Sequence, residues 1–74
     1  METRIVEIAE RIKGLREMMD ITPEEMAKAA GVELEEYLKH ENGEQDFGFT
    51  FLYKCADKLD VEIVELLTGE NPRL

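Results

Sequence analysis

The chain has 74 residues, of which 43% are hydrophobic and 36% charged, and its formal net charge is −9 at pH 7. This length supports one hydrophobic core, and the balance of apolar and charged residues is that of a folded globular domain. The negative charge opposes nonspecific binding to nucleic acid or to an anionic membrane, because cations drive both. Serine is absent and there is one histidine, which excludes a serine hydrolase and a multi-histidine metal site.

The sequence predicts one domain in residues 1–70, followed by a short tail or the start of a linker in residues 71–74. Pro72 opposes continuation of a helix at that point. One cysteine, Cys55, cannot form an internal disulfide, and neither a secretory signal nor a run of about 20 apolar residues is present. We therefore expect a cytoplasmic protein without a membrane partner.

The first predicted helix covers residues 3–18, because apolar side chains recur there at steps of three and four. These side chains are Ile5, Ile8, Ala9, Ile12, Leu15 and Met19. Gly14 lies inside the helix at a cost of roughly 1 kcal/mol relative to alanine. Its presence predicts that another backbone segment passes close by.

The second predicted helix covers residues 23–30 and has the clearest start signal in the chain. Thr22 is placed to cap it, Pro23 suits its first position, and Glu25 completes a capping box. Gly31 can adopt the left-handed conformation that ends a helix. The residues expected to be buried are Met26, Ala27 and Ala30.

The third predicted helix covers residues 33–41 and follows a short turn at Gly31 and Val32. We assign its inner face to Leu38 and to part of Tyr37. Asn42 and Gly43 end it.

The fourth predicted helix covers residues 50–59, with Phe47 or Phe49 closing its entrance. Its expected inward-facing residues are Phe51, Leu52, Cys55, Ala56 and Leu59. Asp60 is the linking residue, since aspartate tolerates the left-handed region. A fifth helix is expected over residues 61–67 and ends at Gly69. Its expected buried residues are Ile63, Leu66 and Leu67, with Val64 outside the inner face.

Two short helices joined by a glycine-containing turn form a helix-turn-helix, which presents its second helix to a DNA major groove. Around this unit the sequence places a larger set of matching residues: Arg16, Ala27, Gly31, Val32, Glu41, Asn42, Gly43, Ala56, Leu59, Val61, Leu66, Leu67 and Gly69. In this spacing the chain resembles the phage repressor and Cro type of helix-turn-helix domain, the XRE family, from about Ile5 to Glu70.

The resemblance implies an all-α, compact five-helix repressor-like bundle whose second and third helices form the helix-turn-helix. It also implies a sequence-specific DNA-binding transcriptional regulator, or the N-terminal domain of a longer one, with double-stranded DNA as partner. In the family, residues matching Arg16 and Glu41 form an ion pair that ties the first helix to the end of the third. No enzymatic activity and no cofactor are expected.

The family's contact positions can be carried over one by one. The base-reading positions fall on Leu34, Glu35 and Lys39, and Pro23 matches a contact at the start of the second helix. Asn42 matches a position that touches phosphate, and Lys28 lies on the helix expected to cross the DNA backbone. Leucine and glutamate depart from the glutamine, serine, threonine or arginine common at the base-reading positions.

Glu33, Glu35 and Glu36 put acid at the start of the helix that would enter DNA, and three interpretations remain open. Acids in a first turn favour the positive end of the helix dipole by roughly 0.3–1 kcal/mol each. A glutamate can also accept a hydrogen bond from the cytosine amino group, which makes Glu35 and Glu36 candidate base contacts. The third interpretation is that this helix meets a basic protein surface instead of DNA.

Other reactive side chains favour structural roles. We interpret His40 as a partly buried packing residue, because no second imidazole or thiol completes a metal site. Cys55 is interpreted as a small core residue. Glu44 and Asp46 alternate as in calcium loops, yet the twelve-residue EF-hand pattern is absent, so no metal is expected.

The alternative function is an acidic protein-interaction module on the same fold, such as an antirepressor or a DNA mimic, that does not bind DNA. Residues 33–46 contain six acids and one lysine, which supports this alternative. Tyr37, Leu34 and His40 along one edge of the third helix would mark a partner surface if they group. The resemblance also implies a possible homodimer through the C-terminal helix, which would suit a palindromic operator.

Overall fold

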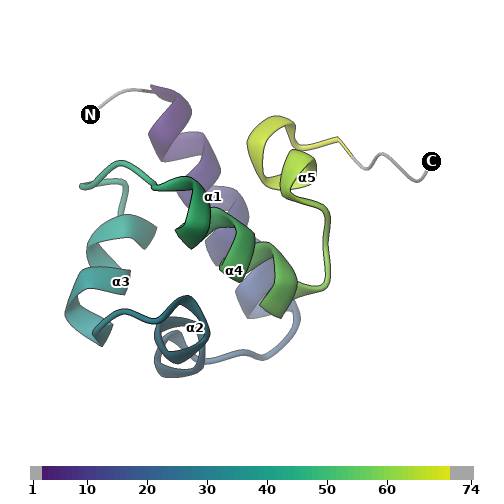
Figure 1. Cartoon of the computed structure of the whole chain (residues 1–74). Helices are drawn as coiled ribbons and strands as arrows, with labels where there is room; N and C mark the ends of the chain where they lie inside the picture. Colours follow the sequence, from purple (N-terminus) through teal and green to yellow (C-terminus); the bar gives the residue numbers. More distant parts are fainter. Residues whose placement is uncertain (1–2, 71–74) are drawn as a thin grey trace.

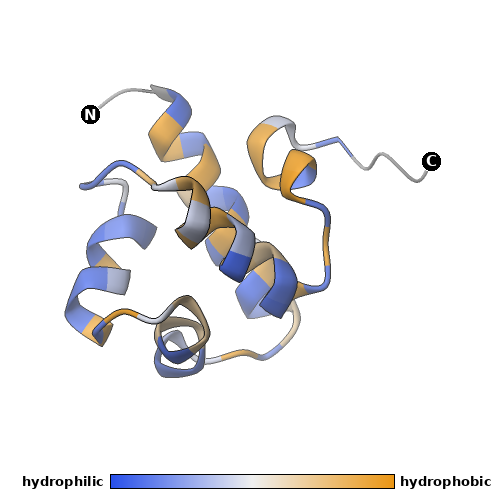
Figure 2. Ribbon diagram, viewed as in Figure 1, coloured by the Kyte–Doolittle hydropathy of each residue, from blue (hydrophilic) through white to orange (hydrophobic). Residues whose placement is uncertain are grey.

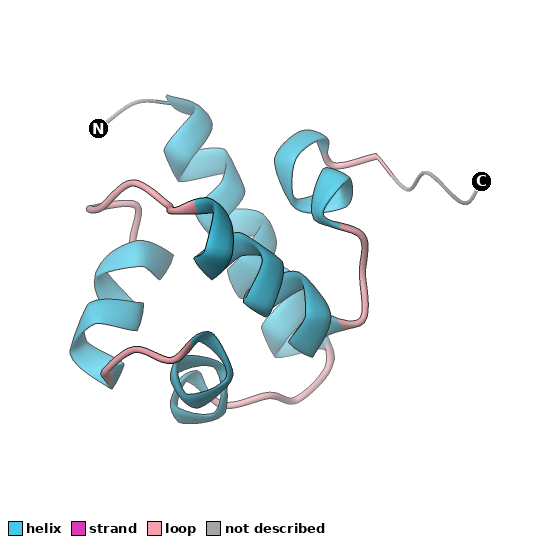
Figure 3. Cartoon of the chain, viewed as in Figure 1, coloured by secondary structure: helices cyan, strands magenta, loops and turns pink. Residues whose placement is uncertain are grey.

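The computed structural model describes residues 3–70, and these form helices joined by short turns (Figure 1). The helices are α1 (Thr3–Met18), α2 (Pro23–Ala30), α3 (Leu34–Glu41), α4 (Phe49–Leu59) and α5 (Ile63–Thr68). Within residues 3–70 there is no strand, so the predicted all-α class is confirmed (Figure 3). Figure 1 shows α4 in front of α1, with α2 and α3 on one side of this pair and α5 on the other.

The ends of α2 match the predicted signals. The Thr22 hydroxyl accepts a hydrogen bond from the Glu25 N–H at 3.1 Å, and the Glu25 carboxylate accepts one from the Thr22 N–H at 3.0 Å. Gly31 has φ 75° and its N–H bonds to the Lys28 carbonyl, while the Val32 N–H bonds to the Ala27 carbonyl. The chain therefore leaves α2 by a left-handed stop that glycine adopts without strain.

The bounds of α1 match the prediction, whereas the starts of the last three helices differ from it by one or two residues. α3 begins after Glu33, whose extended backbone makes it the capping residue. α4 begins at Phe49, one residue earlier than predicted, and α5 begins after Glu62, two residues later than predicted. Asp60 has φ 57°, the left-handed conformation expected of it. Such shifts are typical because helix ends carry few periodic side chains.

The turn after α3 brings Gly43 into contact with α1. Gly43 has φ 74°, and a Cβ on it would lie 3.3 Å from Cγ2 of Val6 on α1. A side chain at this position would therefore strain the backbone and crowd α1. Asp20 also adopts a left-handed φ, of 57°, in the turn after α1, which the sequence pattern did not indicate.

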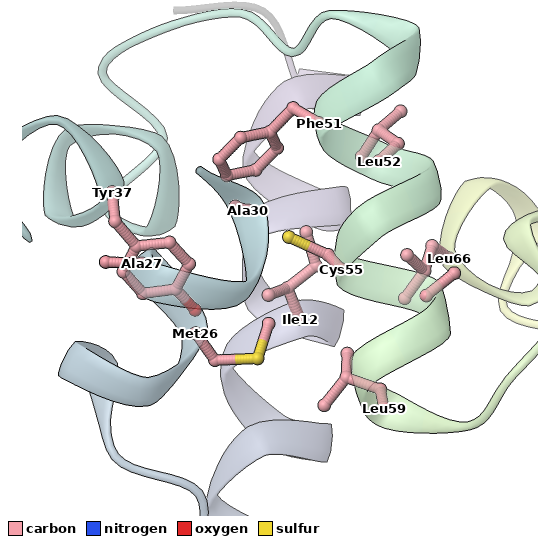
Figure 4. Close-up of a cluster of buried hydrophobic side chains, with 11 residues drawn as sticks. Ile12, Met26, Ala27, Ala30, Tyr37, Phe51, Leu52, Cys55, Leu59 and Leu66 are labelled. Atoms are coloured by element: carbon pink, nitrogen blue, oxygen red, sulfur yellow. The ribbon is translucent and has the colours of Figure 1, made fainter. Parts of the chain in front are cut away.

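The core lies where all five helices meet, and Figure 4 shows its side chains converging between α1, α2 and α4. The largest fully buried side chains are Tyr37, Ile12, Met26, Leu59, Leu66 and Cys55. Cys55 is fully buried, which confirms its predicted role as a small core residue. Burial of each large apolar side chain contributes about 1.5–3 kcal/mol, so a domain this small depends on every one of them.

Several burial predictions were wrong. Leu38 is 36% exposed, and Leu67 is 40% exposed. Met19 lies beyond the end of α1 and is 43% exposed, because the chain turns at Asp20 before another helical turn forms. An added Cβ on Gly14 would meet nothing within 4 Å, so no backbone passes close to it.

Phe47, not Phe49, closes the entrance to α4. Phe47 is half-buried and packs against the core, whereas Phe49 is 62% exposed and its ring lies 5.0 Å from that of Tyr53. Val64 is exposed, as expected. The pattern of apolar residues could not separate the two phenylalanines, because they lie on either side of the capping residue Gly48.

The predicted tail or linker at residues 71–74 lies outside the described residues. Among residues 3–70, no helix combines the length and the apolar character needed to cross a membrane. Nor does that part of the chain bring together three or more histidine, cysteine, aspartate or glutamate side chains able to hold a metal ion.

Candidate nucleic-acid interface

The orientation of α3 follows from its buried side chains. Tyr37, His40 and Glu41 are buried and face the core, and successive residues of a helix are rotated by about 100°. Glu35 and Lys39 therefore project away from the core, and both are exposed. Figure 2 shows α3 drawn largely in hydrophilic colours, in contrast to the apolar stripe of α1. The outer face of α3 is consequently a polar surface on a firmly packed helix.

The structure places the sequence-predicted contact residues in two groups. Leu34, Glu35, Glu36 and Lys39 are all exposed on α3, and Asn42 follows at its end. Pro23 is half-buried at the start of α2, while Lys28 is exposed in the last turn of α2. Lys28 borders a groove shared with α4, so it does not join the group on α3.

His40 is a packing residue beneath this face. Its ring centre lies 4.2 Å from that of Phe51 and 5.4 Å from that of Phe47. Nε2 is 3.9 Å from a carboxylate oxygen of Glu36, and Nδ1 is buried without a hydrogen-bond partner within the described part of the chain. The imidazole thus joins the end of α3 to the start of α4, which agrees with the packing role predicted for it. Its burial is greater than the partial burial expected.

Tyr37 occupies the centre of the inner face of α3. Its ring packs against Phe51, and its hydroxyl is buried near Glu41 without the geometry of a hydrogen bond. Burial, and secondly the nearby Glu41 carboxylate, raise the pKa of this phenol. Burial likewise raises the pKa of the Cys55 thiol to about 12. Burial therefore favours the neutral form of both groups near neutral pH.

An ion pair connects α1 to the end of α3. Arg16 donates from Nε to one carboxylate oxygen of Glu41 and from Nη2 to the other, each at 2.9 Å. Nη1 donates to the Ile21 carbonyl at 2.9 Å, which fixes the turn after α1. Both side chains are buried, and the hydrogen bond to Glu41 is the main cause that raises the pKa of Arg16. This two-point contact sets the angle at which α3 leaves the core.

This arrangement of helices matches a known protein family. A family model described as a helix-turn-helix domain matches residues 9–72. The chain belongs to this helix-turn-helix family. The helix-turn-helix unit is α2 and α3, joined through Gly31, Val32 and Glu33. The predicted resemblance to the XRE type of domain is thereby confirmed.

A solved structure has the same fold. The chain is similar to the restriction-modification controller protein C.AhdI from Aeromonas hydrophila, with a TM-score of 0.82 and 25% sequence identity. The match covers 88% of this chain and 98% of that protein. No curated protein matches the chain. Family and fold are those of DNA-binding regulators.

The helix-turn-helix domain carries an acidic surface where family members approach DNA. Of the six acids in residues 33–46, Glu41 is buried and paired with Arg16. The other five acids are exposed: Glu33, Glu35, Glu36, Glu44 and Asp46. Lys39 is the one lysine in residues 33–46. Glu35 and Glu36 lie in the first turn of α3, where the positive end of the helix dipole favours them.

The cations of the domain divide into internal and exposed sets. Arg11 donates to the carbonyls of Leu66 and Leu67 at 3.0 and 3.2 Å, so it holds the end of α5 against α1. Sequence reasoning missed this role, since a lone arginine on a helix carries no signal for a partner 55 residues away. Within residues 3–70 the exposed cations are Arg4, Lys13, Lys28, Lys39, Lys54 and Lys58.

Proposed function

We propose that this domain is a sequence-specific DNA-binding transcriptional regulator that reads the major groove with the outer face of α3. The observation that carries the proposal is the exposed group of Leu34, Glu35 and Lys39 on a helix fixed by the Arg16–Glu41 ion pair. The similarity to C.AhdI, a controller protein, supports a regulatory role.

Each side chain of this face has a matching base-edge chemistry. Lys39 can donate to the O6 and N7 atoms of guanine, and Glu35 or Glu36 can accept from the amino group of cytosine. Leu34 is 36% exposed at the start of α3 and can contact a thymine methyl group. Pro23, Lys28 and Asn42 are proposed contacts to the sugar-phosphate backbone, which position the domain but do not specify sequence.

We also propose a homodimer through the C-terminal helix. Val64 and Leu67 are 39% and 40% exposed on α5, and their spacing of three residues puts them on one side of this helix, where a second copy could cover both. A two-fold dimer would place two copies of α3 on two half-sites of a palindromic operator.

Selection of bound duplexes from a random pool tests this function. We expect an enriched motif with two half-sites, and weaker binding by Lys39→Glu than by Lys13→Glu, the same charge change on exposed α1. Each specific base contact contributes about 1–3 kcal/mol of discrimination, so Lys39→Glu should weaken binding roughly tenfold or more. Failure to enrich any motif at low salt would refute sequence-specific binding.

A second candidate function is supported by the five exposed acids of residues 33–46. In this alternative the same face binds a basic protein surface, as in an antirepressor or a DNA mimic, and does not bind DNA. The double substitution Glu35→Lys and Glu36→Lys separates the two functions. Creation of DNA binding where the unmodified protein shows none would favour the second, while loss of an existing motif preference would favour the first.

A further inference from the structure

A groove runs between α2 and α4, apart from the outer face of α3; Lys28, proposed above as a phosphate contact, lies at its edge. It consists of two adjoining hollows of about 520 and 380 Å³, and Ala29 and Lys58 line both. Tyr53, which is 56% exposed, forms part of the wall. The groove is therefore wide, shallow and accessible, with a small apolar floor.

Three lysines border this groove: Lys28 from α2, and Lys54 and Lys58 from α4. They are half of the six exposed cations within residues 3–70. None of the ion pairs in the described structure involves them, although the chain has 18 acids. The Lys54 ammonium lies over the end of α2, 3.4 Å from the position of a Cβ on Gly31.

The helix dipole explains the positions of two of these lysines. Lys28 and Lys58 are each in the last turn of a helix, where a cation favours the negative end of the dipole. That effect acts on each helix separately, and it does not require the lysines of two helices to meet across one groove. Their convergence leaves a local positive surface on a chain of net charge −9.

The outer face of α3 has the opposite pattern. Glu33, Glu35 and Glu36 are exposed there with one cation, Lys39. The groove has three lysines with two exposed acids, Glu25 and Asp57, at its edges. The groove is therefore mainly positive and the α3 face mainly negative, so the two surfaces are complementary in charge. Both surfaces are present on every copy of the chain.

We propose that the groove between α2 and α4 binds the acidic face of α3 of a second copy of this chain. The contact is head-to-tail, because two different surfaces meet, and it is separate from a two-fold dimer through α5. It covers the α3 face and so competes with any other partner of that face. The proposal does not rest on DNA binding. The contact is weak and salt-sensitive, because its charges are exposed and screened within about 8–10 Å at 0.1–0.15 M salt.

The first test is the concentration dependence of the unmodified protein. Backbone amide spectra recorded from 0.05 to 2 mM protein, at about 0.1 M salt, should shift at residues of α3 and of the groove. The same dilution series at about 1 M salt, where the screening length falls to about 3 Å, should give much smaller shifts. Spectra that do not depend on concentration, or shifts confined to α5, would overturn the proposal.

The second test uses charge exchange. Variant one carries Lys54→Glu and Lys58→Glu, and variant two carries Glu35→Lys and Glu36→Lys; all four positions are exposed, so both variants should fold. Each variant alone should lose concentration-dependent shifts, because its groove and its α3 face then have like charge. An equimolar mixture should restore association, as measured by sedimentation equilibrium and by amide shifts.

The control is Lys13→Glu, which changes the charge of exposed α1 away from the groove. It should associate as the unmodified protein does. If the mixture fails to associate, or if Lys13→Glu abolishes association as completely as variant one, the contact is not the one proposed. No step of this experiment uses DNA, so its failure is distinguishable from failure of the regulatory function.

Discussion

Arg16 and Glu41 show how one buried pair can set the geometry of a surface. Burial of an ion costs several kcal/mol unless a partner and hydrogen bonds compensate it. Here every guanidinium nitrogen has an acceptor, since Nε and Nη2 bind Glu41 and Nη1 binds the Ile21 carbonyl. The pair therefore specifies the position of α3 relative to α1 more than it adds net stability.

Removal of either Arg16 or Glu41 alone should consequently destabilise the domain strongly. Arg16→Ala should lower the free energy of unfolding by about 3–5 kcal/mol, because Glu41 stays buried without its counter-ion. Urea unfolding followed by circular dichroism measures this change. If the total stability is near about 5 kcal/mol, the low end of the usual range, a loss of this size leaves a substantial unfolded fraction.

A matched control and a double variant make this prediction specific. Glu17 lies 3.8 Å from the same guanidinium but is mostly exposed, so Glu17→Ala should cost less than about 1 kcal/mol. Arg16→Met combined with Glu41→Leu should recover much of the stability that either change alone removes. Additive losses in the double variant would contradict a coupled buried pair.

At the scale of the element, the sequence predicted helices far better than it predicted their faces. α2 was located to the residue, because Thr22, Pro23, Glu25 and Gly31 each make a local contact that sequence specifies directly. α3 has only eight residues, and its inner face consists of Tyr37, His40 and Glu41, two of which count as polar. Their burial depends on partners from α1 and α4, which no pattern within α3 shows.

The contact residues of the candidate site could be predicted from the sequence, but the way in which residues of different helices converge could not. The exposed positions Leu34, Glu35 and Lys39 came from a family resemblance, and the structure places all three at the surface of α3. The groove that Lys28 shares with Lys58 could not be predicted, because it joins residues from two helices 30 positions apart. Convergence of this kind is set by the crossing of α2 and α4.

The capping box of α2 gives a prediction that depends on pH. The pKa of Glu25 is lowered from 4.5, first by the hydrogen bond from the Thr22 N–H, then by the Thr22 hydroxyl, with a smaller effect of Lys58. A lowered folded-state pKa stabilises the fold above the unfolded pKa, and this stabilisation is lost as pH falls through the folded pKa. The stability that depends on Glu25 should therefore decline below about pH 4.5.

Carbon-detected nuclear magnetic resonance titration of the Glu25 carboxylate checks this. The midpoint should lie below 4.5 in the unmodified protein and should move upward in Thr22→Ala, which removes the hydroxyl. Thr68→Ala is the control, because its hydroxyl bonds only within and just after α5. A Glu25 midpoint that Thr22→Ala leaves unchanged would show that the hydroxyl does not contribute.

At the scale of the whole molecule, the distribution of charge matters more than its sum. The net charge of −9 opposes approach to DNA, and five exposed acids lie in residues 33–46, around and just beyond α3. Arg11 and Arg16 are used internally, which leaves Lys39 on α3 and Lys28 on α2 as the cations proposed to meet DNA. Specificity must therefore come from base contacts and shape, with a small electrostatic contribution from phosphate neutralisation.

The measurement that tests DNA recognition by α3 most directly is the affinity for a selected duplex across salt concentrations. If Lys28 and Lys39 neutralise about two phosphates per protomer, the logarithm of the binding constant should fall with the logarithm of salt concentration with a slope of about −2. Lys39→Glu should reduce that slope by about 1 and weaken binding, while Lys13→Glu should leave the slope unchanged. Absence of binding at low salt, or an affinity that does not respond to salt, would contradict DNA recognition by α3.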